Sequence, residues 1–315
     1  MNKQKLIGRC IVVSSLAVLT ACGGGGGSSG EGGGNAEPTL SLDSSNYASK
    51  KIEISPSTNV TNFNQLSTDM NDAFGLIGDL HESLWNQSGG VSGTTNCDGG
   101  GTATVTYAGK DRNDDESWEF NDCVVSTYSH GVVLLNGTFR YVDTLTDETA
   151  TSERWNGYES YNITGELKSS GETLDVKGRS DWDQLFSWEN GIESGRFTDT
   201  IGTFELKVGN RYIALTNTET RLEGAGSDAK FSMSGTLIGS AIEGHVQIST
   251  PTPVSISEYE TCPTEGIIRI SSAGSAEVRY GSSAAGTAGA VAVWIDGQIV
   301  ESYADCNGVG FAPVY

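Results

Sequence analysis

Alternation of apolar and polar side chains runs through most of the chain after Gly100. In residues 204–208, for example, Phe204, Leu206 and Val208 are separated by polar residues, and residues 276–280 show the same spacing. A period of two is typical of strands that bury one face and leave the other in water, an arrangement found mainly in antiparallel sheets. The pattern predicts a mainly β fold of roughly ten to fourteen strands joined as hairpins.

Several of these predicted strands contain a single glycine between polar neighbours, namely Gly137, Gly165, Gly178, Gly235 and Gly244. Glycine weakens a strand, but it also lets the strand bend or approach another backbone closely. We therefore expect a large curled antiparallel sheet or a partial barrel. The spacing of the predicted strands is too irregular for a propeller or a solenoid.

Residues 62–86 depart from the period of two, because their apolar residues are three and four positions apart. These residues are Phe63, Leu66, Met70, Phe74, Ile77, Leu80 and Leu84. This spacing predicts one N-terminal amphipathic helix, whose apolar stripe must cover another apolar surface. We expect the helix to pack against the concave side of the curled sheet.

Residues 1–21 have the layout of a secretory signal peptide, with a basic start, a mostly apolar stretch and small residues at the end. The sequence Leu19-Thr20-Ala21-Cys22 resembles the cleavage signal of bacterial lipoproteins. That resemblance implies cleavage before Cys22, lipidation of Cys22 and a membrane as partner through this lipid anchor. Gly23 is not the aspartate that retains such proteins in the inner membrane of enteric bacteria. We therefore expect a lipid-anchored protein of the outer membrane, either surface-exposed or facing the periplasm.

The remaining chain is divided by changes in composition. Residues 22–50 are rich in Gly, Ser and Asn, which predicts a flexible lipidated tether. Residues 51–250 are expected to form the domain made of the helix and the antiparallel strands. Pro251 and Pro253 interrupt the pattern, so residues 251–315 are predicted to be a C-terminal β extension closed by a disulfide. This extension could be a small subdomain or the last strands of the same sheet, and we favour the second arrangement.

Cysteine usage fits an oxidising compartment. One cysteine leaves with the signal peptide and Cys22 takes the lipid, so that four cysteines remain. An even number in an exported chain indicates two disulfides, and four cysteines allow three pairings. We predict the pairs Cys97–Cys123 and Cys262–Cys306, because each pair brackets one compact hairpin-like segment.

The net charge excludes some classes of partner. The chain has a formal charge of −21, and removal of residues 1–21 lowers it to −24. This charge argues against nucleic acid, whose phosphates require lysine and arginine. It also argues against adsorption onto an anionic membrane surface, so that attachment depends on the lipid.

The chain contains no recognisable catalytic signature. Neither a nucleophile elbow nor a phosphate-binding loop is present, and we predict a non-enzymatic protein without a cofactor. An acidic segment with Asp111, Asn113 and Asp115 resembles the start of a calcium loop. However, Glu116 stands at the place where such a loop needs glycine. We interpret the segment as a solvated hairpin turn, in which these three residues are weak metal-ligand candidates and no metal site is predicted.

Aromatic residues are concentrated in a span of 34 residues, together with Asp181 and Asp183, which are expected to share one strand face. The aromatic candidates for ligand binding are Trp155, Tyr158, Tyr161, Trp182 and Trp188. Carboxylates among aromatic rings suit glycan binding. Tryptophan and tyrosine are also common in sheet cores and at barrel rims, so packing is the alternative interpretation.

Three short motifs follow the predicted helix: C-x-G-G at 97–100, F-x-x-C at 120–123 and L-N-G-T at 135–138. Their order resembles that of a group of uncharacterised lipoproteins of Gram-negative bacteria, over about residues 60–306. The resemblance supports the pairing of Cys97 with Cys123. It implies no established activity.

These observations lead us to expect an outer-membrane-anchored lipoprotein with a binding or envelope-structural role. One alternative is a periplasmic carrier or chaperone for a lipidic ligand held in a half-barrel. A second alternative is a glycan-binding module. The partner would accordingly be a glycan, a lipid or an envelope protein. An apolar cavity on the concave face would favour the carrier, and a filled interior would argue against it.

Overall fold

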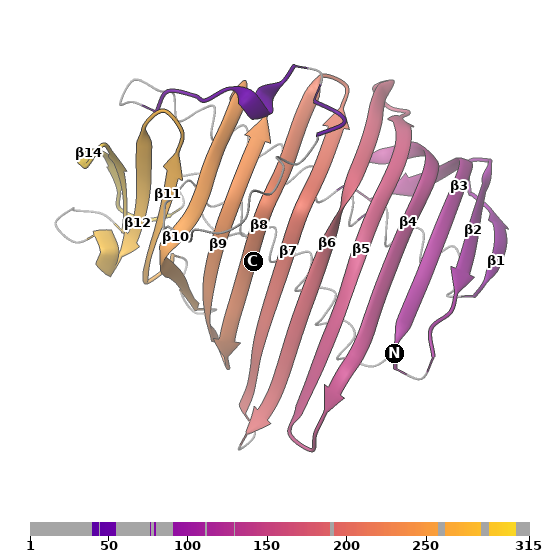
Figure 1. The fold of residues 1–315 in the computed structure, drawn as a ribbon, viewed down its shortest axis with the longest axis horizontal. Helices are drawn as coiled ribbons and strands as arrows, with labels where there is room; N and C mark the ends of the chain where they lie inside the picture. The colour runs from indigo at the N-terminus through magenta and orange to yellow at the C-terminus, as the bar shows by residue number, and fades with distance from the viewer. Residues whose placement is uncertain are drawn as a thin grey trace.

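The computed structural model describes residues 40–43, 45–54, 76, 79, 91–110, 112–128, 130–189, 192–257, 262–284 and 290–306. These residues form one antiparallel sheet of 14 strands, in which each strand pairs with its neighbours in sequence (Figure 1). The mainly β fold is thereby confirmed. The strands are β1 (Gly93–Asn96), β2 (Thr102–Tyr107), β3 (Asp114–Thr127), β4 (Gly131–Glu148), β5 (Ser152–Leu167), β6 (Glu172–Glu189), β7 (Ile192–Val208), β8 (Arg211–Ala225), β9 (Asp228–Gly239), β10 (Gly244–Ser257), β11 (Glu265–Ser271), β12 (Ser275–Gly281), β13 (Val291–Ile295) and β14 (Gln298–Tyr303). Two 3-10 turns, η2 (Tyr47–Ser49) and η3 (Ser282–Ala284), accompany them.

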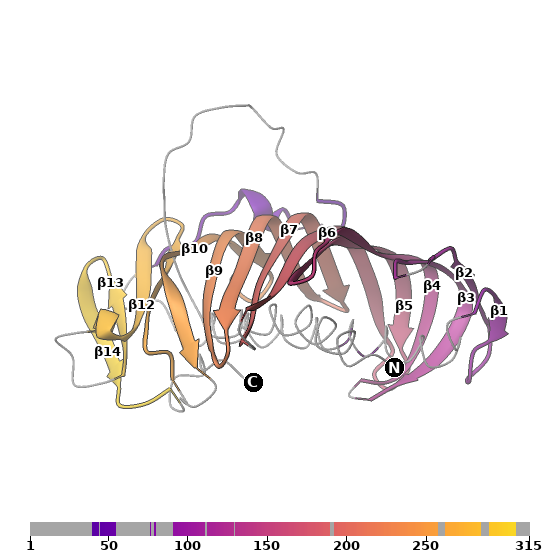
Figure 2. The same cartoon turned by 90° about the horizontal axis from the view of Figure 1, so that it is seen from below.

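The sheet is curved into an open arch with a convex and a concave face (Figure 2). It does not close, because β1 and β14 stand at opposite ends of the strand order. The period-two pattern explains the two faces. Ile213 and Leu215 belong to the main core, whereas their neighbours Tyr212 and Ala214 belong to a separate small cluster on the other face.

Gly137 shows how the sheet reaches its curvature. Its φ is +108°, and a Cβ atom there would lie 2.1 Å from the carbonyl oxygen of Asn162 on β5. Such a distance is far inside van der Waals contact, so only glycine lets β4 and β5 approach this closely. The expectation that strand glycines permit close approach is correct at this position.

Only two residues of the predicted helix 62–86 are described, Leu76 and Asp79, and both are helical. Leu76 is 2% exposed and belongs to the main core, although the period did not place it on the apolar stripe. Asp79 lies 3.4 Å from the Nδ1 atom of His130, at the β3–β4 turn. The other residues of this helix lie outside the described part of the chain. Among the residues that the structure describes, none belongs to a helix with the length and hydrophobicity needed to cross a bilayer.

The C-terminal strands continue the same sheet, as favoured. Strand β10 runs through Pro251 and Pro253, and its register with β11 shifts on both sides of Thr252. Proline has no N–H to donate to the neighbouring strand, which explains the irregularity without a domain boundary. Both predicted disulfides are confirmed: the Cα atoms are 5.4 Å apart in Cys97–Cys123 and in Cys262–Cys306.

Residues 40–43 and 45–50, which fall within the predicted tether, contact the sheet. We call residues 40–43 and 45–54 the strap. Figures 1 and 2 show its indigo ribbon on the convex side, near β8 to β10. Leu40, Leu42 and Tyr47 pack against the small convex-face cluster of β8 and β9. Lys51 of the strap forms an isolated parallel bridge with His245.

Candidate functional site

The five aromatic candidates are divided between the two faces of the sheet. On β5 and β6, residues that alternate with the convex-face residues point to the concave side. Four of the candidates are in such positions: Trp155, Tyr161, Trp182 and Trp188. Tyr158 alone points to the convex side. Asp181 and Asp183 do share a face, but it is the face opposite Trp182. The predicted combination of tryptophans with these two carboxylates is therefore not formed.

A different set of carboxylates lies among the aromatic rings on the concave side of β3 to β7. Its members are Asp114, Glu116, Asp143, Glu159 and Asp199. Two of them bind indole N–H groups: Trp118 Nε1 donates to Glu116 over 3.4 Å, and Trp182 Nε1 donates to Asp143 over 3.4 Å. Asp114 accepts from Tyr107 over 2.9 Å, and Asp199 accepts from Ser180. Each of these four carboxylates thus accepts at least one hydrogen bond, whereas Oε1 of Glu116 is buried and accepts none from the described residues.

Burial changes the proton affinity of two of these carboxylates. Burial raises the pKa of Glu159 to about 7, against the opposing effect of a hydrogen bond from Tyr161. Burial also raises the pKa of Asp199 to about 6, although hydrogen bonds from Ser180 and from the backbone of Thr200 oppose the shift. Asp199 is 2% exposed, and Glu116 is 0% exposed. A ligand from solution cannot reach such groups in this conformation, so we do not treat the layer as a binding site.

The acidic segment after Lys110 is only partly a turn. Strand β3 begins at Asp114, and the period of two places Asp114 and Glu116 in the core. Asn113 accepts the backbone N–H of Leu145 over 2.8 Å, and Asp115 is paired with Arg140 over 3.3 Å. The third weak metal candidate, Asp111, lies outside the described residues. No group of three or more described His, Cys, Asp or Glu side chains is arranged to hold a metal ion.

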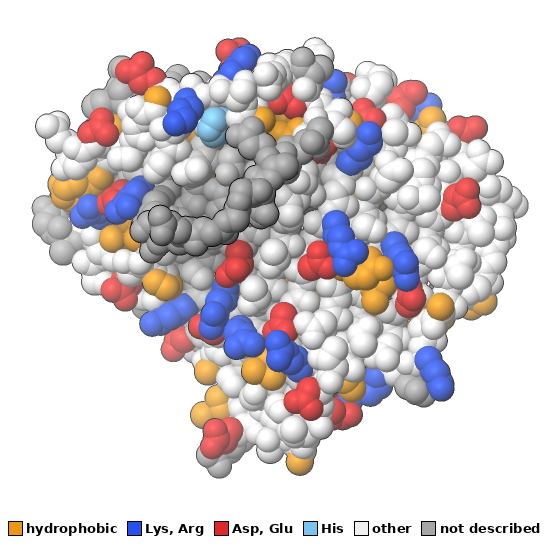
Figure 3. Space-filling view, in the orientation of Figure 1, with side chains coloured by type: hydrophobic (Ala, Val, Ile, Leu, Met, Phe, Trp, Pro, Cys, Tyr) orange, Lys and Arg blue, Asp and Glu red, His pale blue; other side chains and the backbone are white. Residues whose placement is uncertain are grey.

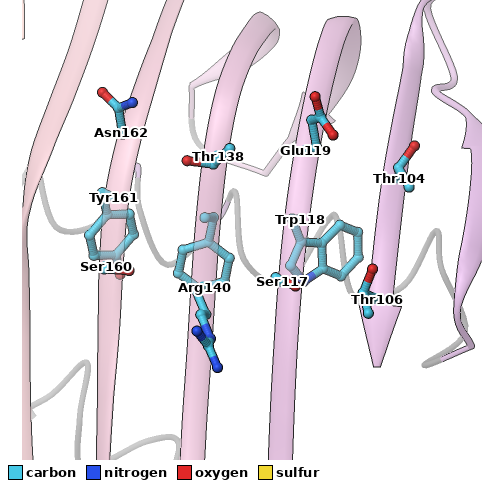
Figure 4. Close-up of a pocket in the computed structure, with 11 residues that line it drawn as sticks. Thr104, Thr106, Ser117, Trp118, Glu119, Thr138, Arg140, Ser160, Tyr161 and Asn162 are labelled. Atoms are coloured by element: carbon cyan, nitrogen blue, oxygen red, sulfur yellow. The ribbon is translucent and has the colours of Figure 1, made fainter. Parts of the chain in front are cut away.

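A polar depression of about 470 Å³ lies on the convex face of β2 to β5. We call it the trough. Its lining residues come from the neighbouring strands β2, β3, β4 and β5, as Figure 4 illustrates. Its side chains belong to two rows that cross the strands. These are Thr104, Glu119, Thr138 and Asn162 in one row, and Thr106, Ser117, Arg140 and Ser160 in the other.

The floor between the two rows is formed by residues whose side chains lie on the other face. Trp118, Phe139 and Tyr161 line the trough, yet they are only 2%, 4% and 7% exposed. Since strand side chains alternate, their rings point into the main core and mainly their backbone borders the trough. The packed aromatic layer thus fixes the positions of the polar residues on either side.

Most polar side chains of the trough are uncommitted. Within the part of the chain that the structure describes, six of them have no side-chain hydrogen bond or ion pair: Thr106, Ser117, Glu119, Thr138, Ser160 and Asn162. Some charged groups elsewhere on this face are paired, as in Arg154–Asp183 at 2.6 Å. Figure 3 shows few charged side chains over β2 and β3 and more of them toward the middle and lower part of this face.

No pattern within a single strand of the sequence indicates the trough. Its residues lie in predicted strands, but no single strand contains the site. The rows exist only because the register places Glu119 opposite Thr138, and Thr138 opposite Asn162. A hydroxyl-rich outer face on consecutive predicted strands is the one sequence signal that could have indicated it. Cys22, the predicted lipidation site, lies outside the described residues.

Comparison with protein-family models, with curated proteins and with solved structures finds no match to this chain.

Proposed function

We propose that this chain is a lipid-anchored envelope protein that binds a neutral saccharide in the trough. The observation that carries the binding role is the set of six uncommitted polar side chains on a rigid four-stranded floor. The anchor and the outer-membrane location rest on the sequence around Cys22 and stay predictions.

The chemistry of the trough fits a ligand with many hydroxyl groups. Hydroxyl and amide side chains both donate and accept hydrogen bonds, as saccharide hydroxyls do. The floor crosses four strands, which is about 14 Å at the usual strand spacing and is long enough for a short oligosaccharide. A polyanion fits less well, because the only cationic lining residue, Arg140, is already paired with Asp115.

The affinity is expected to be weak. Sugar sites gain much of their affinity from an open aromatic ring, and the rings beneath the trough point into the core. The nearest convex-face ring is Tyr158, and the guanidinium of Arg179 lies over it at 3.7 Å from the centroid. Binding by hydrogen bonds alone gives a dissociation constant on the order of 1 mM.

Catalysis and lipid transport are not part of the proposal. Glycoside hydrolysis ordinarily uses two carboxylates, and the trough contains Glu119 alone. A carrier for a lipidic ligand would need an apolar cavity. The trough is polar, and on the concave face side chains such as Val125, Leu135 and Val176 are completely buried.

Binding to a panel of soluble oligosaccharides tests the proposal. The panel contains neutral and anionic members, and affinity is measured by calorimetry. We expect neutral members to bind the wild-type protein. Asn162→Ala and Glu119→Gln should weaken binding at least tenfold, because the first removes an amide and the second replaces a charged acceptor oxygen with a donor. Ser234→Ala, an exposed change on the same face of β9, is the matched control and should bind as the wild type does.

Two outcomes would contradict the proposal. One is the absence of binding by every neutral oligosaccharide at concentrations well above 1 mM. The other is binding that Asn162→Ala and Glu119→Gln leave unchanged, which would place the saccharide elsewhere on the molecule.

A further inference from the structure

The N-terminal end of the strap is bound on the convex face by one buried carboxylate. Glu205 on β7 is 2% exposed. Its oxygens accept the backbone N–H groups of Ser41 and Leu42 at 2.8 and 2.9 Å, and the hydroxyl of Ser41 at 2.9 Å. The hydroxyl of Tyr212 donates to the same carboxylate over 3.1 Å. Burial and the neighbouring Glu205 raise the pKa of Tyr212, so that it remains a donor.

The docked strap changes the place where the chain leaves the sheet. At its other end, the carbonyl of Ile52 accepts from Ala273 in the β11–β12 turn, and Ile54 enters the main core. A chain that left the sheet at Ile52 would start about six strand spacings from β5, or about 29 Å. The docked strap starts instead at Glu205 on β7. Glu205 pairs with Lys177 on β6, and Lys177 pairs with Asn162 on β5, which is a residue of the trough. The start of the docked strap is therefore two strand spacings from β5, or about 10 Å.

The remaining tether is short. Seventeen residues, 23–39, separate Cys22 from the strap. A Gly- and Ser-rich chain of this length has a root-mean-square span of about 23 Å. A membrane attached at Cys22 would therefore stay within a few tens of ångströms of the trough. Short tethers of this kind give an effective concentration in the millimolar range or above.

We propose that the trough binds the saccharide headgroup of a glycolipid in the same leaflet as the lipid anchor. The inference rests on the proposed function and names its partner. A site with a dissociation constant on the order of 1 mM is poorly occupied by a dilute free sugar. It is well occupied by a headgroup that the tether holds next to it. The strap, fixed by Glu205, serves to bring the anchor to the convex face and to the end of the trough.

Chemical labelling of the protein's lysines, while the protein is attached to vesicles, tests this inference with the native sequence. In the mature chain Cys22 is the one cysteine outside the two disulfides, so it can be coupled to a maleimide phospholipid. The vesicles contain phosphatidylcholine alone, or phosphatidylcholine with a neoglycolipid that carries the tightest-binding oligosaccharide of the panel. A membrane-impermeant amine reagent then acetylates lysines, and mass spectrometry measures the rate at each one.

Lys177 lies between the trough and the strap and reports on the headgroup, while Lys168 at the β5–β6 turn is the control. We expect the neoglycolipid to slow acetylation of Lys177 at least fivefold and to leave Lys168 unchanged. Glu205→Ala should weaken this protection, since it releases the N-terminal end of the strap and lengthens the tether, while binding of the soluble oligosaccharide stays the same. Leu42→Asp also releases the strap but changes no residue of the sheet. It therefore serves as the second test variant in case Glu205→Ala does not fold.

The possible failures are distinguishable. If the soluble oligosaccharide binds but Lys177 reacts equally on both vesicles, the ligand is a free saccharide and the glycolipid proposal is wrong. If protection of Lys177 is undiminished in both strap variants, the strap does not position the trough and that part of the inference is wrong. If no soluble oligosaccharide binds, the proposed function fails and the inference fails with it.

Discussion

At the scale of single residues, the most unusual feature is the layer of carboxylates inside the sheet. The sequence contained a signal for part of it: Asp114, Glu116, Trp118 and Phe120 follow one another at a period of two. Reading them as one strand face would have placed both acids in the core with the aromatic residues. Their acidic composition indicated a solvated turn instead. The period proved more informative than the polarity, because a tyrosine donates to Asp114 and a tryptophan donates to one oxygen of Glu116.

This layer makes stability depend on pH. The pKa of Glu159 is raised to about 7 and that of Asp199 to about 6, chiefly by burial. The folded state therefore holds the protons of these two groups more tightly, so their contribution to stability is fully present below about pH 4 and is lost as the pH rises from about 4 to about 7. At about 1.4 kcal/mol per pH unit, each group costs on the order of 3 kcal/mol by pH 8. Urea unfolding should show a lower midpoint at pH 8 than at pH 5.

The matched variant is Glu159→Gln, which removes one of the two titrations. It should reduce the difference in stability between pH 5 and pH 8 by about two thirds, because part of the Asp199 effect is already lost at pH 5. Asp183 does not interfere: burial would raise its pKa, but hydrogen bonds from Arg154 and Asn156 lower it, so that it stays ionised across this window. Equal midpoints at both pH values would contradict the account of the buried layer.

At the scale of secondary structure, the period of two predicted most of the strands and their hairpin order, but not their register. Register depends on bulges and close approaches that a single strand does not reveal. Gly137 illustrates the point, because its need for glycine comes from the carbonyl of Asn162 on the next strand. The trough was missed for the same reason. The predicted disulfides were correct, since sequence separations of 26 and 44 bracket local hairpins and need no register.

Gly137→Ala should strongly destabilise the sheet. The new Cβ would lie 2.1 Å from the Asn162 oxygen and would also strain a positive φ. We expect a loss of about 3 kcal/mol or more in the free energy of unfolding, measured with urea. Gly202→Ala is the control, since a Cβ at Gly202 would have no atom within 4 Å. It should be neutral or slightly stabilising, and equal effects at the two positions would contradict the explanation of the curvature.

At the scale of the whole molecule, one open sheet with two different faces organises everything else. The concave face holds the main core, and the convex face holds the trough and the strap. The low-complexity composition of residues 22–50 concealed the strap, because Leu40, Leu42 and Tyr47 are too few to form a recognisable period. Their docking depends on Glu205, more than 160 residues away in sequence. Such a contact cannot be predicted without the fold.

The most direct test of the trough as a saccharide site is to map it by nuclear magnetic resonance. Backbone amide shifts of the mature protein are followed during titration with the tightest-binding neutral oligosaccharide. The account predicts that the shifts concentrate in β2 to β5, around Glu119, Thr138 and Asn162. Shifts that instead gather around Trp155 and Trp188, or that are absent at saturating saccharide, would contradict it.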